Sequence, residues 1–186
     1  MPNEYEGHWI STRSVPKFYY LDPQPQDILI EDIAHALSMI CRFGGHTSRF
    51  YSVAEHSIRV AGQLESYEAN EDYQLAGLMH DAEEAYLPDI PRPIKADMPE
   101  AKEIYRRLNQ AIMFKFRIPE TIDWSIIKDF DNRLCLTEAK QFGLYNKDWD
   151  SLGREFRNLP EFGWSPEAAE IIFLYVYNDI TQRRAG

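Results

Sequence analysis

The chain has 186 residues, enough for a single domain with a sizeable core, and 44% of them are hydrophobic. Its formal net charge of −10, with no run of Lys or Arg, argues against stable nucleic-acid binding, because phosphate backbones are bound by basic clusters. No apolar stretch approaches the roughly 20 residues that span a bilayer, and the first residues lack the features of a signal peptide, so we expect a cytoplasmic protein with no membrane partner.

The first 27 residues are rich in proline and aromatic residues. Trp9–Thr12 and Lys17–Tyr20 could pair as a short β-hairpin around the Ser14-Val15-Pro16 turn. This hairpin is the only β-structure that the sequence predicts. Residues 1–186 show no internal repeat, low-complexity segment or linker, so we expect one domain.

From Ile28 onward, apolar residues recur at helical spacing. The expected helices cover residues 28–43, a segment beginning near 53, residues 73–87, 99–116 and 119–142, and a last segment from 166. Ser52 and Glu55 form the pattern of a capping box, in which the serine oxygen and the glutamate carboxylate each satisfy a backbone N–H. Ser165-Pro166 supplies an N-cap and a proline at the first helical position. Prolines at 88, 91 and 93 predict an extended loop after the third helix.

The two cysteines, Cys41 and Cys135, lie far apart and in no Cys-x-x-Cys pair. This spacing argues against a zinc knuckle and against a disulfide framework. We expect both to be buried free thiols in helical sequence.

Four potential metal ligands follow one another along the chain: His56, the pair His80-Asp81, and Asp131. Imidazole nitrogens and carboxylate oxygens suit a divalent transition ion such as zinc, cobalt or manganese, and four of them leave room for water. Each alone would more often be a surface residue, but Asp131 falls among apolar residues, where an unpaired carboxylate is costly to bury. Neighbours on a helix point about 100° apart, so His80 and Asp81 can share an ion only at the flank of their helix. The set therefore predicts a helical bundle around a central ion.

These motifs resemble those of the HD-domain phosphohydrolases, in particular the 5′-deoxynucleotidases and the phage dATP triphosphohydrolases. The resemblance extends from Asp32 to Asp131. It rests on Ile33-Ala34-His35, Cys41-Arg42-Phe43, Val53-Ala54-Glu55-His56-Ser57, His80-Asp81-Ala82-Glu83-Glu84, Asp89-Ile90-Pro91-Arg92-Pro93-Ile94-Lys95 and Asp131. It implies an all-α HD-domain helical bundle in which His56, His80, Asp81 and Asp131 hold the metal.

The resemblance also implies roles around that ion. Glu84 matches the catalytic glutamate of the family and Asp89 a second acidic residue. Arg42 matches an arginine that contacts phosphate, and its planar fork of donors suits phosphate oxygens. Further phosphate contacts are expected from Lys95 and, more weakly, from Lys128 and the loop residue His46. Phe43 stands where these nucleotidases often carry a tryptophan that packs on the sugar, so discrimination of the sugar is less secure.

The implied reaction is hydrolysis of a deoxynucleotide at the α-phosphate, giving a deoxynucleoside and phosphate or triphosphate. dATP is the favoured substrate, and a general 5′-deoxynucleotidase acting on monophosphates is the alternative. A cyclic-nucleotide or guanosine-tetraphosphate hydrolase of the same fold and a non-catalytic metal-binding module are the remaining readings. The resemblance further implies a homo-oligomer, a dimer or larger, located in the host cytoplasm if the gene is carried by a phage.

Overall fold

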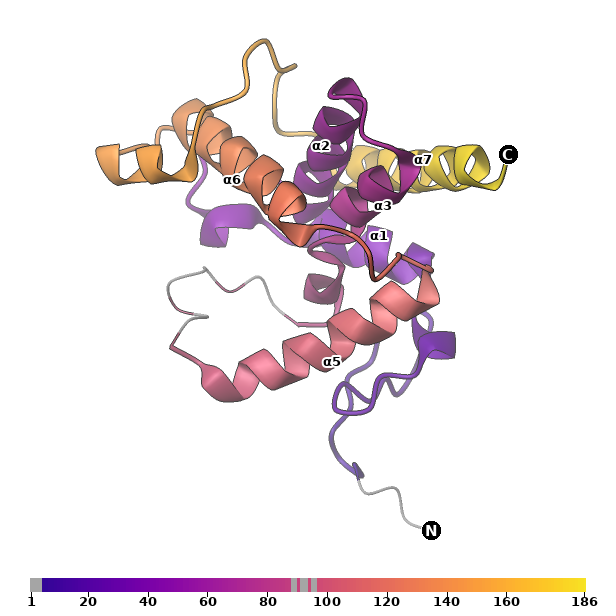
Figure 1. Cartoon of the computed structure of the whole chain (residues 1–186). Helices are drawn as coiled ribbons and strands as arrows, with labels where there is room; N and C mark the ends of the chain where they lie inside the picture. Colours follow the sequence, from indigo (N-terminus) through magenta and orange to yellow (C-terminus); the bar gives the residue numbers. More distant parts are fainter. Residues whose placement is uncertain (1–4, 88–89, 91–93, 95–96) are drawn as a thin grey trace.

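The structure is a computed structural model that describes residues 5–87, 90, 94 and 97–186. Its α-helices are α1 (Ile30–Met39), α2 (Val53–Ser66), α3 (Glu71–Met79), α5 (Pro99–Lys115), α6 (Trp124–Gln141) and α7 (Pro166–Ala185) (Figure 1). Short 3-10 helices occupy η1 (Pro25–Asp27), η2 (Arg42–Gly45), η3 (Ala82–Ala85) and η4 (Lys147–Leu152). No β-strand occurs within the described ranges, so the expected all-α class is confirmed there.

The predicted N-terminal hairpin is reduced to a single antiparallel bridge between Ile10 and Phe18. Between these two residues the chain turns toward α1 instead of continuing a ladder. The hydroxyls of Thr12 and Ser14 each donate to the buried carboxylate of Asp32, at 2.6 Å. Those bonds anchor the N-terminal segment to the first turn of α1, and Pro16 removes a backbone donor that a longer ladder would need.

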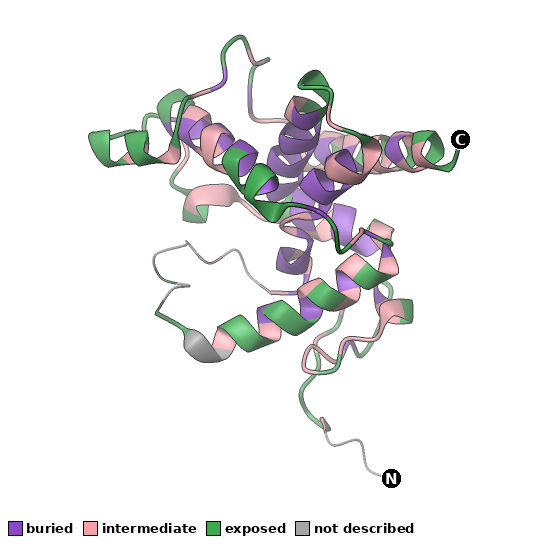
Figure 2. Ribbon diagram, viewed as in Figure 1, coloured by how far each residue is buried: buried purple, intermediate pink, exposed green. Residues whose placement is uncertain are grey.

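α2 is the central helix of the fold. It packs against α1, α3, α6 and α7, and every residue from Val53 to Ala61 is buried (Figure 2). A helix buried on all sides is the core of its domain. α5 lies apart from this group and reaches it through η1 and η3 (Figure 1).

Three predicted helices begin or end elsewhere. The helix expected over 28–43 covers only Ile30–Met39, and residues 42–45 form the separate turn η2. The helix expected over 73–87 stops at Met79, and residues 82–85 form the separate turn η3. The helix expected from 119 begins only at Trp124, because the Asp123 carboxylate accepts the backbone N–H of Ser125 and caps it there. Ile122 precedes α6 but is still buried in the core.

The predicted caps are confirmed at Ser52 and Ser165, each of which accepts a backbone N–H three residues on. Glu55, however, does not complete a capping box. Its completely buried carboxylate accepts from Arg59 and from the backbone N–H groups of Gly163 and Trp164. Glu55 therefore fastens residues 163–164 to α2.

Both cysteines are free thiols, as expected, but they are half-buried where burial was predicted. Cys41 is not helical: it precedes η2 and forms an isolated bridge with Ser52. Cys135 lies on α6.

In the described part of the chain no helix is both long and apolar enough to cross a bilayer.

Candidate metal centre

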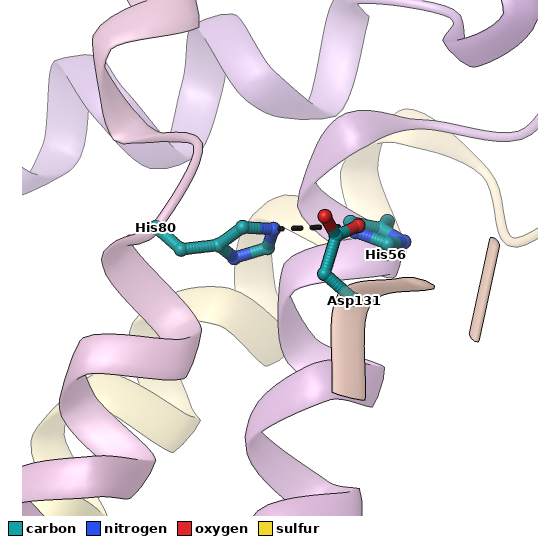
Figure 3. A group of neighbouring side chains, drawn as sticks. All are labelled: His56, His80 and Asp131. Carbon is teal, nitrogen blue, oxygen red and sulfur yellow. Dashed lines mark ion pairs between the residues drawn. The ribbon is translucent and has the colours of Figure 1, made fainter. Parts of the chain in front are cut away.

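Three potential ligands from three parts of the fold converge on one point. His56 comes from α2, His80 directly follows α3, and Asp131 lies in the middle of α6. One ligand atom from each lies within 4.8 Å of the others, and Figure 3 shows the two rings and the carboxylate turned toward one another. As expected, these three residues come from separate parts of the fold, and together they could hold a metal ion.

The distances leave a place for an ion. Asp131 Oδ1 lies 3.2 Å from His56 Nε2 and 4.0 Å from His80 Nε2. Both Nε2 atoms are buried, and neither makes a hydrogen bond of good geometry within the described chain. Two buried imidazole nitrogens and a carboxylate oxygen form a donor set that suits a divalent transition ion. The residues present therefore fit a metal.

Asp81 joins this group through its Oδ2 atom, which lies 3.2 Å from His80 Nε2 and 3.9 Å from His56 Nε2. The expectation that His80 and Asp81 share an ion at a helix flank is wrong in its premise, because α3 ends before them. His80 keeps helical angles, but Asp81 leaves them at φ −110°, ψ 17°. Ending the helix at this point lets two consecutive side chains face the same centre.

The two histidines are oriented through their other ring nitrogen. His80 Nδ1 donates to the carbonyl oxygen of Gly77 at 2.7 Å, and His56 Nδ1 donates to Glu138 Oε1 at 2.6 Å. Hydrogen bonds of this kind fix the tautomer of metal-binding histidines. The sequence analysis did not single out Glu138, although it stands two helical turns after Asp131 and so lies on the same face of α6.

The charges of the centre shift its pKa values. Burial lowers the pKa of His80, but the carboxylates of Asp81 and Asp131 outweigh burial and raise it to about 9. Burial raises the pKa of Asp81, yet His80 holds it below its usual range. The pKa of Asp131 is likewise lowered by His56 and His80 against the effect of burial. Without metal, the centre is a set of buried ion pairs.

Two of the predicted phosphate-binding residues touch this centre. Arg42 Nη1 lies 3.4 Å from Asp81 Oδ2, and Arg42 Nε lies 3.3 Å from Glu138 Oε2. Lys128 Nζ lies 2.7 Å from Asp131 Oδ2. Both cations are therefore held at the acidic centre and face the same cavity.

That cavity has a volume of about 990 Å³ and lies between α5, α6, η3 and η4. The predicted site residues in its wall are Arg42, Phe43, His80, Asp81, Glu84, Lys128 and Asp131. The sequence analysis missed others, chiefly Glu83, Asn109, Trp124, Trp149 and Cys135. These residues belong to segments far apart in the sequence, and only the folded structure shows that the segments meet at one cavity.

Four predicted site residues are not placed in the cavity wall. His56 is completely buried on α2, where it meets His80 and Asp131. His46 is exposed in the loop after η2 and does not belong to the cavity wall. Asp89 and Lys95 lie outside the described residues. Their roles stay predictions.

The chain is similar along most of its length to a protein of Escherichia coli strain K12 named "Uncharacterized protein YfdR". The two are 35% identical over 181 residues, which cover 95% of this chain and 97% of YfdR. An uncharacterized protein of Rhodobacter capsulatus is 35% identical over 147 residues, covering 75% of each chain. No protein-family model matches the chain. These names assign no activity, so a function has to be argued from the site.

Proposed function

This chain belongs to the same family as the Escherichia coli protein YfdR, and we propose that it is a metal-dependent phosphohydrolase of the HD-domain type. The proposed reaction is cleavage of a deoxynucleotide at the α-phosphate, with dATP as the favoured substrate. The observation that carries this proposal is the convergence of His56, His80, Asp81 and Asp131, of which the last three line a large cavity. The preference for dATP rests on the sequence resemblance alone.

The four converging residues would hold a zinc, cobalt or manganese ion. Such an ion lowers the pKa of water toward about 7 and neutralises charge on phosphoryl oxygens. The charge of the cavity wall implies that a cation must be bound there before a phosphate can enter. Among its described residues, the acids Asp81, Glu83, Glu84, Asp131 and Asp148 outnumber the cations Arg42 and Lys128. A phosphate would be repelled from this wall unless a bound cation offset the excess negative charge.

Glu84 is the residue that we propose for proton transfer. Its side chain is buried in η3, one turn beyond Asp81, and lines the cavity. A carboxylate in such a position can accept a proton from the attacking water and donate one to the departing 5′-oxygen. Arg42 would meet the phosphate with its forked donors, and Lys128 would add a point charge.

Part of the cavity wall is aromatic and suits a nucleobase. The Phe43 and Trp149 rings lie 6.1 Å apart between centroids, at an interplanar angle of 51°, and Trp124 lines the same cavity. Tryptophan faces bind bases by stacking, which tolerates different bases. The volume of about 990 Å³ matches the upper end of the range for small-molecule sites, about 300–1,000 Å³. A nucleoside triphosphate is therefore a suitable occupant.

A general 5′-deoxynucleotidase is the second candidate, since the same wall would accept a monophosphate. A panel of deoxy- and ribonucleotides with one, two or three phosphates, assayed with Zn²⁺, Co²⁺ or Mn²⁺, separates the two. We expect dATP to give deoxyadenosine and intact triphosphate. Turnover of monophosphates alone would replace the dATP assignment, and turnover of no nucleotide with any metal would overturn the proposed function.

Glu84→Gln distinguishes an enzyme from a non-catalytic metal-binding module. General acid–base catalysis is worth about 10²–10⁴-fold, so we expect turnover to fall by that factor while the bound metal is retained. Glu120→Gln is the control, because Glu120 is exposed and does not line the cavity. Equal turnover in the two variants would remove Glu84 from the mechanism.

A further inference from the structure

We infer that Glu138 is a positioning residue of the metal centre, which orients His56 toward the ion and holds Arg42 beside Asp81. This inference rests on the proposed function, since it concerns the same centre. Glu138 would touch neither substrate nor metal. It would act through the two side chains that it binds.

The contacts of Glu138 divide between its two oxygens. Oε1 accepts hydrogen bonds from His56 Nδ1 and from the Tyr51 hydroxyl, each at 2.6 Å. Oε2 lies 3.3 Å from Arg42 Nε. Glu138, His56 and Tyr51 are all completely buried. A carboxylate is retained in such a place only when charged or hydrogen-bonding partners offset the cost of burying it.

The pairing with His56 determines which ring nitrogen faces the centre. An ionised carboxylate can only accept hydrogen bonds, so His56 Nδ1 must carry a proton. The lone pair of the neutral ring then lies on Nε2, which is the atom 3.2 Å from Asp131 Oδ1. Metal-binding histidines commonly depend on a carboxylate or carbonyl behind them in this way.

His80 shows the same arrangement with a different partner. Its Nδ1 donates to the backbone carbonyl of Gly77, so its Nε2 also faces Asp131. The backbone carbonyl is present whatever the side chain at position 77. Within the described residues, the Nδ1 atom of His56 bonds to a side chain and not to a backbone carbonyl, so the orientation of this ring depends on Glu138.

Glu138 also links the ion site to the proposed phosphate site. Arg42 lies between two acids, with Nε toward Glu138 and Nη1 3.4 Å from Asp81 Oδ2. The side chain of Arg42 is only 11% exposed, so it has little freedom to point elsewhere. Loss of the Glu138 charge would release one end of this arginine and leave the other on a metal ligand.

Glu138→Gln is an isosteric test that cannot satisfy these partners. If the amide oxygen takes the place of Oε1, the NH₂ group faces the Arg42 Nε–H. If the amide is reversed, the NH₂ group faces the two donors of His56 and Tyr51. Either orientation brings donors against one another in a buried site.

Glu55→Gln is the matched control. Glu55 is also a completely buried carboxylate, and it pairs with Arg59 and with backbone N–H groups at 163–164, away from the centre. We expect both variants to lose stability in urea unfolding. Only Glu138→Gln should bind Co²⁺ more weakly in calorimetry, by about 10–100-fold.

Histidine ¹⁵N–¹H NMR supplies a second measurement that does not need a variant. In the wild type, with or without Zn²⁺, we expect a downfield, slowly exchanging Nδ1 proton on His56, retained in Glu55→Gln and lost or shifted in Glu138→Gln. Absence of this proton in the wild type, or equal Co²⁺ affinity in the two variants, would overturn the inference. Failure of the wild type to bind metal would instead contradict the proposed function, while the His56 proton would still test the role of Glu138.

Discussion

α2 and α3, the elements that lead to His56 and His80, are in close contact at Gly77. A Cβ added at Gly77 would overlap Leu64 Cδ1 and lie 3.3 Å from Val60 Cγ1, and both of these residues are completely buried in α2. The Gly77 carbonyl also accepts the His80 Nδ1 proton. Gly77→Ala would therefore force Leu64 to shift within a close-packed core beside the metal centre.

The magnitude follows from two opposing effects. Alanine is favoured over glycine within a helix by about 1 kcal/mol. Overfilling a close-packed core costs about 1–3 kcal/mol. Gly62→Ala isolates the first effect, because Gly62 lies on α2 with no atom within 4 Å of an added Cβ. The free energies of unfolding of the two variants should thus differ by about 1–3 kcal/mol, with Gly77→Ala the less stable.

Urea unfolding followed by circular dichroism measures this difference, and calorimetric titration with Co²⁺ measures the effect on the centre. We expect Gly62→Ala to be as stable as the wild type or more stable, with unchanged Co²⁺ affinity. Gly77→Ala should lose both stability and affinity. Equal stability and equal affinity in the two variants would refute the reasoning that this close approach supports the ligand geometry.

Three further predictions concern pH, the ion and the base. Burial raises the pKa of Asp32, but the hydrogen bonds from Ser14 and Thr12 lower it further, so its native pKa lies below the usual value. Asp32→Asn should therefore destabilise the protein at neutral pH and have less effect as the pH falls through that lowered pKa. Urea unfolding at several pH values tests this, and an effect independent of pH would contradict it. Metal binding at neutral pH should release protons, because the raised pKa of His80, about 9, keeps its ring charged in the metal-free protein. Calorimetric titration with metal in buffers of different ionisation enthalpy measures this release. Identical heats of binding in all buffers would argue against it. Trp149→Ala should remove a stacking face for the base and so weaken nucleotide binding by about 1–3 kcal/mol, while hydrolysis of deoxyribose 5-phosphate stays unchanged. Comparison of the KM values of the two substrates tests this. An equal effect on both substrates would rule out the stacking role.

Local sequence signals predicted most of the helical fold because they act within a few residues. Periodic apolar positions and the Ser52 and Ser165 caps placed α2 and α7 correctly at their first turns. The prediction failed where side chains compete with the helix. The Asp123 cap makes α6 begin later than the apolar pattern predicts. The turn after His80 makes α3 end earlier than the pattern predicts.

The convergence of His56, His80 and Asp131 was predictable, because the histidines and the aspartates occur in order along the chain and a carboxylate among apolar residues needs a partner. The residues that surround the ligands were not predictable from local pattern. Glu138 meets His56 across 82 positions of sequence, and Trp149 reaches the cavity from a connection with no strong periodicity. The capping-box pattern at Ser52 and Glu55 was correct only in part. Ser52 caps α2 as predicted, but the Glu55 carboxylate bonds to backbone groups more than 100 positions away.

Anomalous X-ray diffraction from crystals grown with Zn²⁺, measured on both sides of the zinc absorption edge, shows whether these four residues bind a metal. We expect one strong zinc peak within about 2.0–2.2 Å of His56 Nε2, His80 Nε2 and an Asp131 oxygen, with an Asp81 oxygen completing the set. A protein that contains no zinc at this point, or that binds zinc only at surface residues, would contradict it.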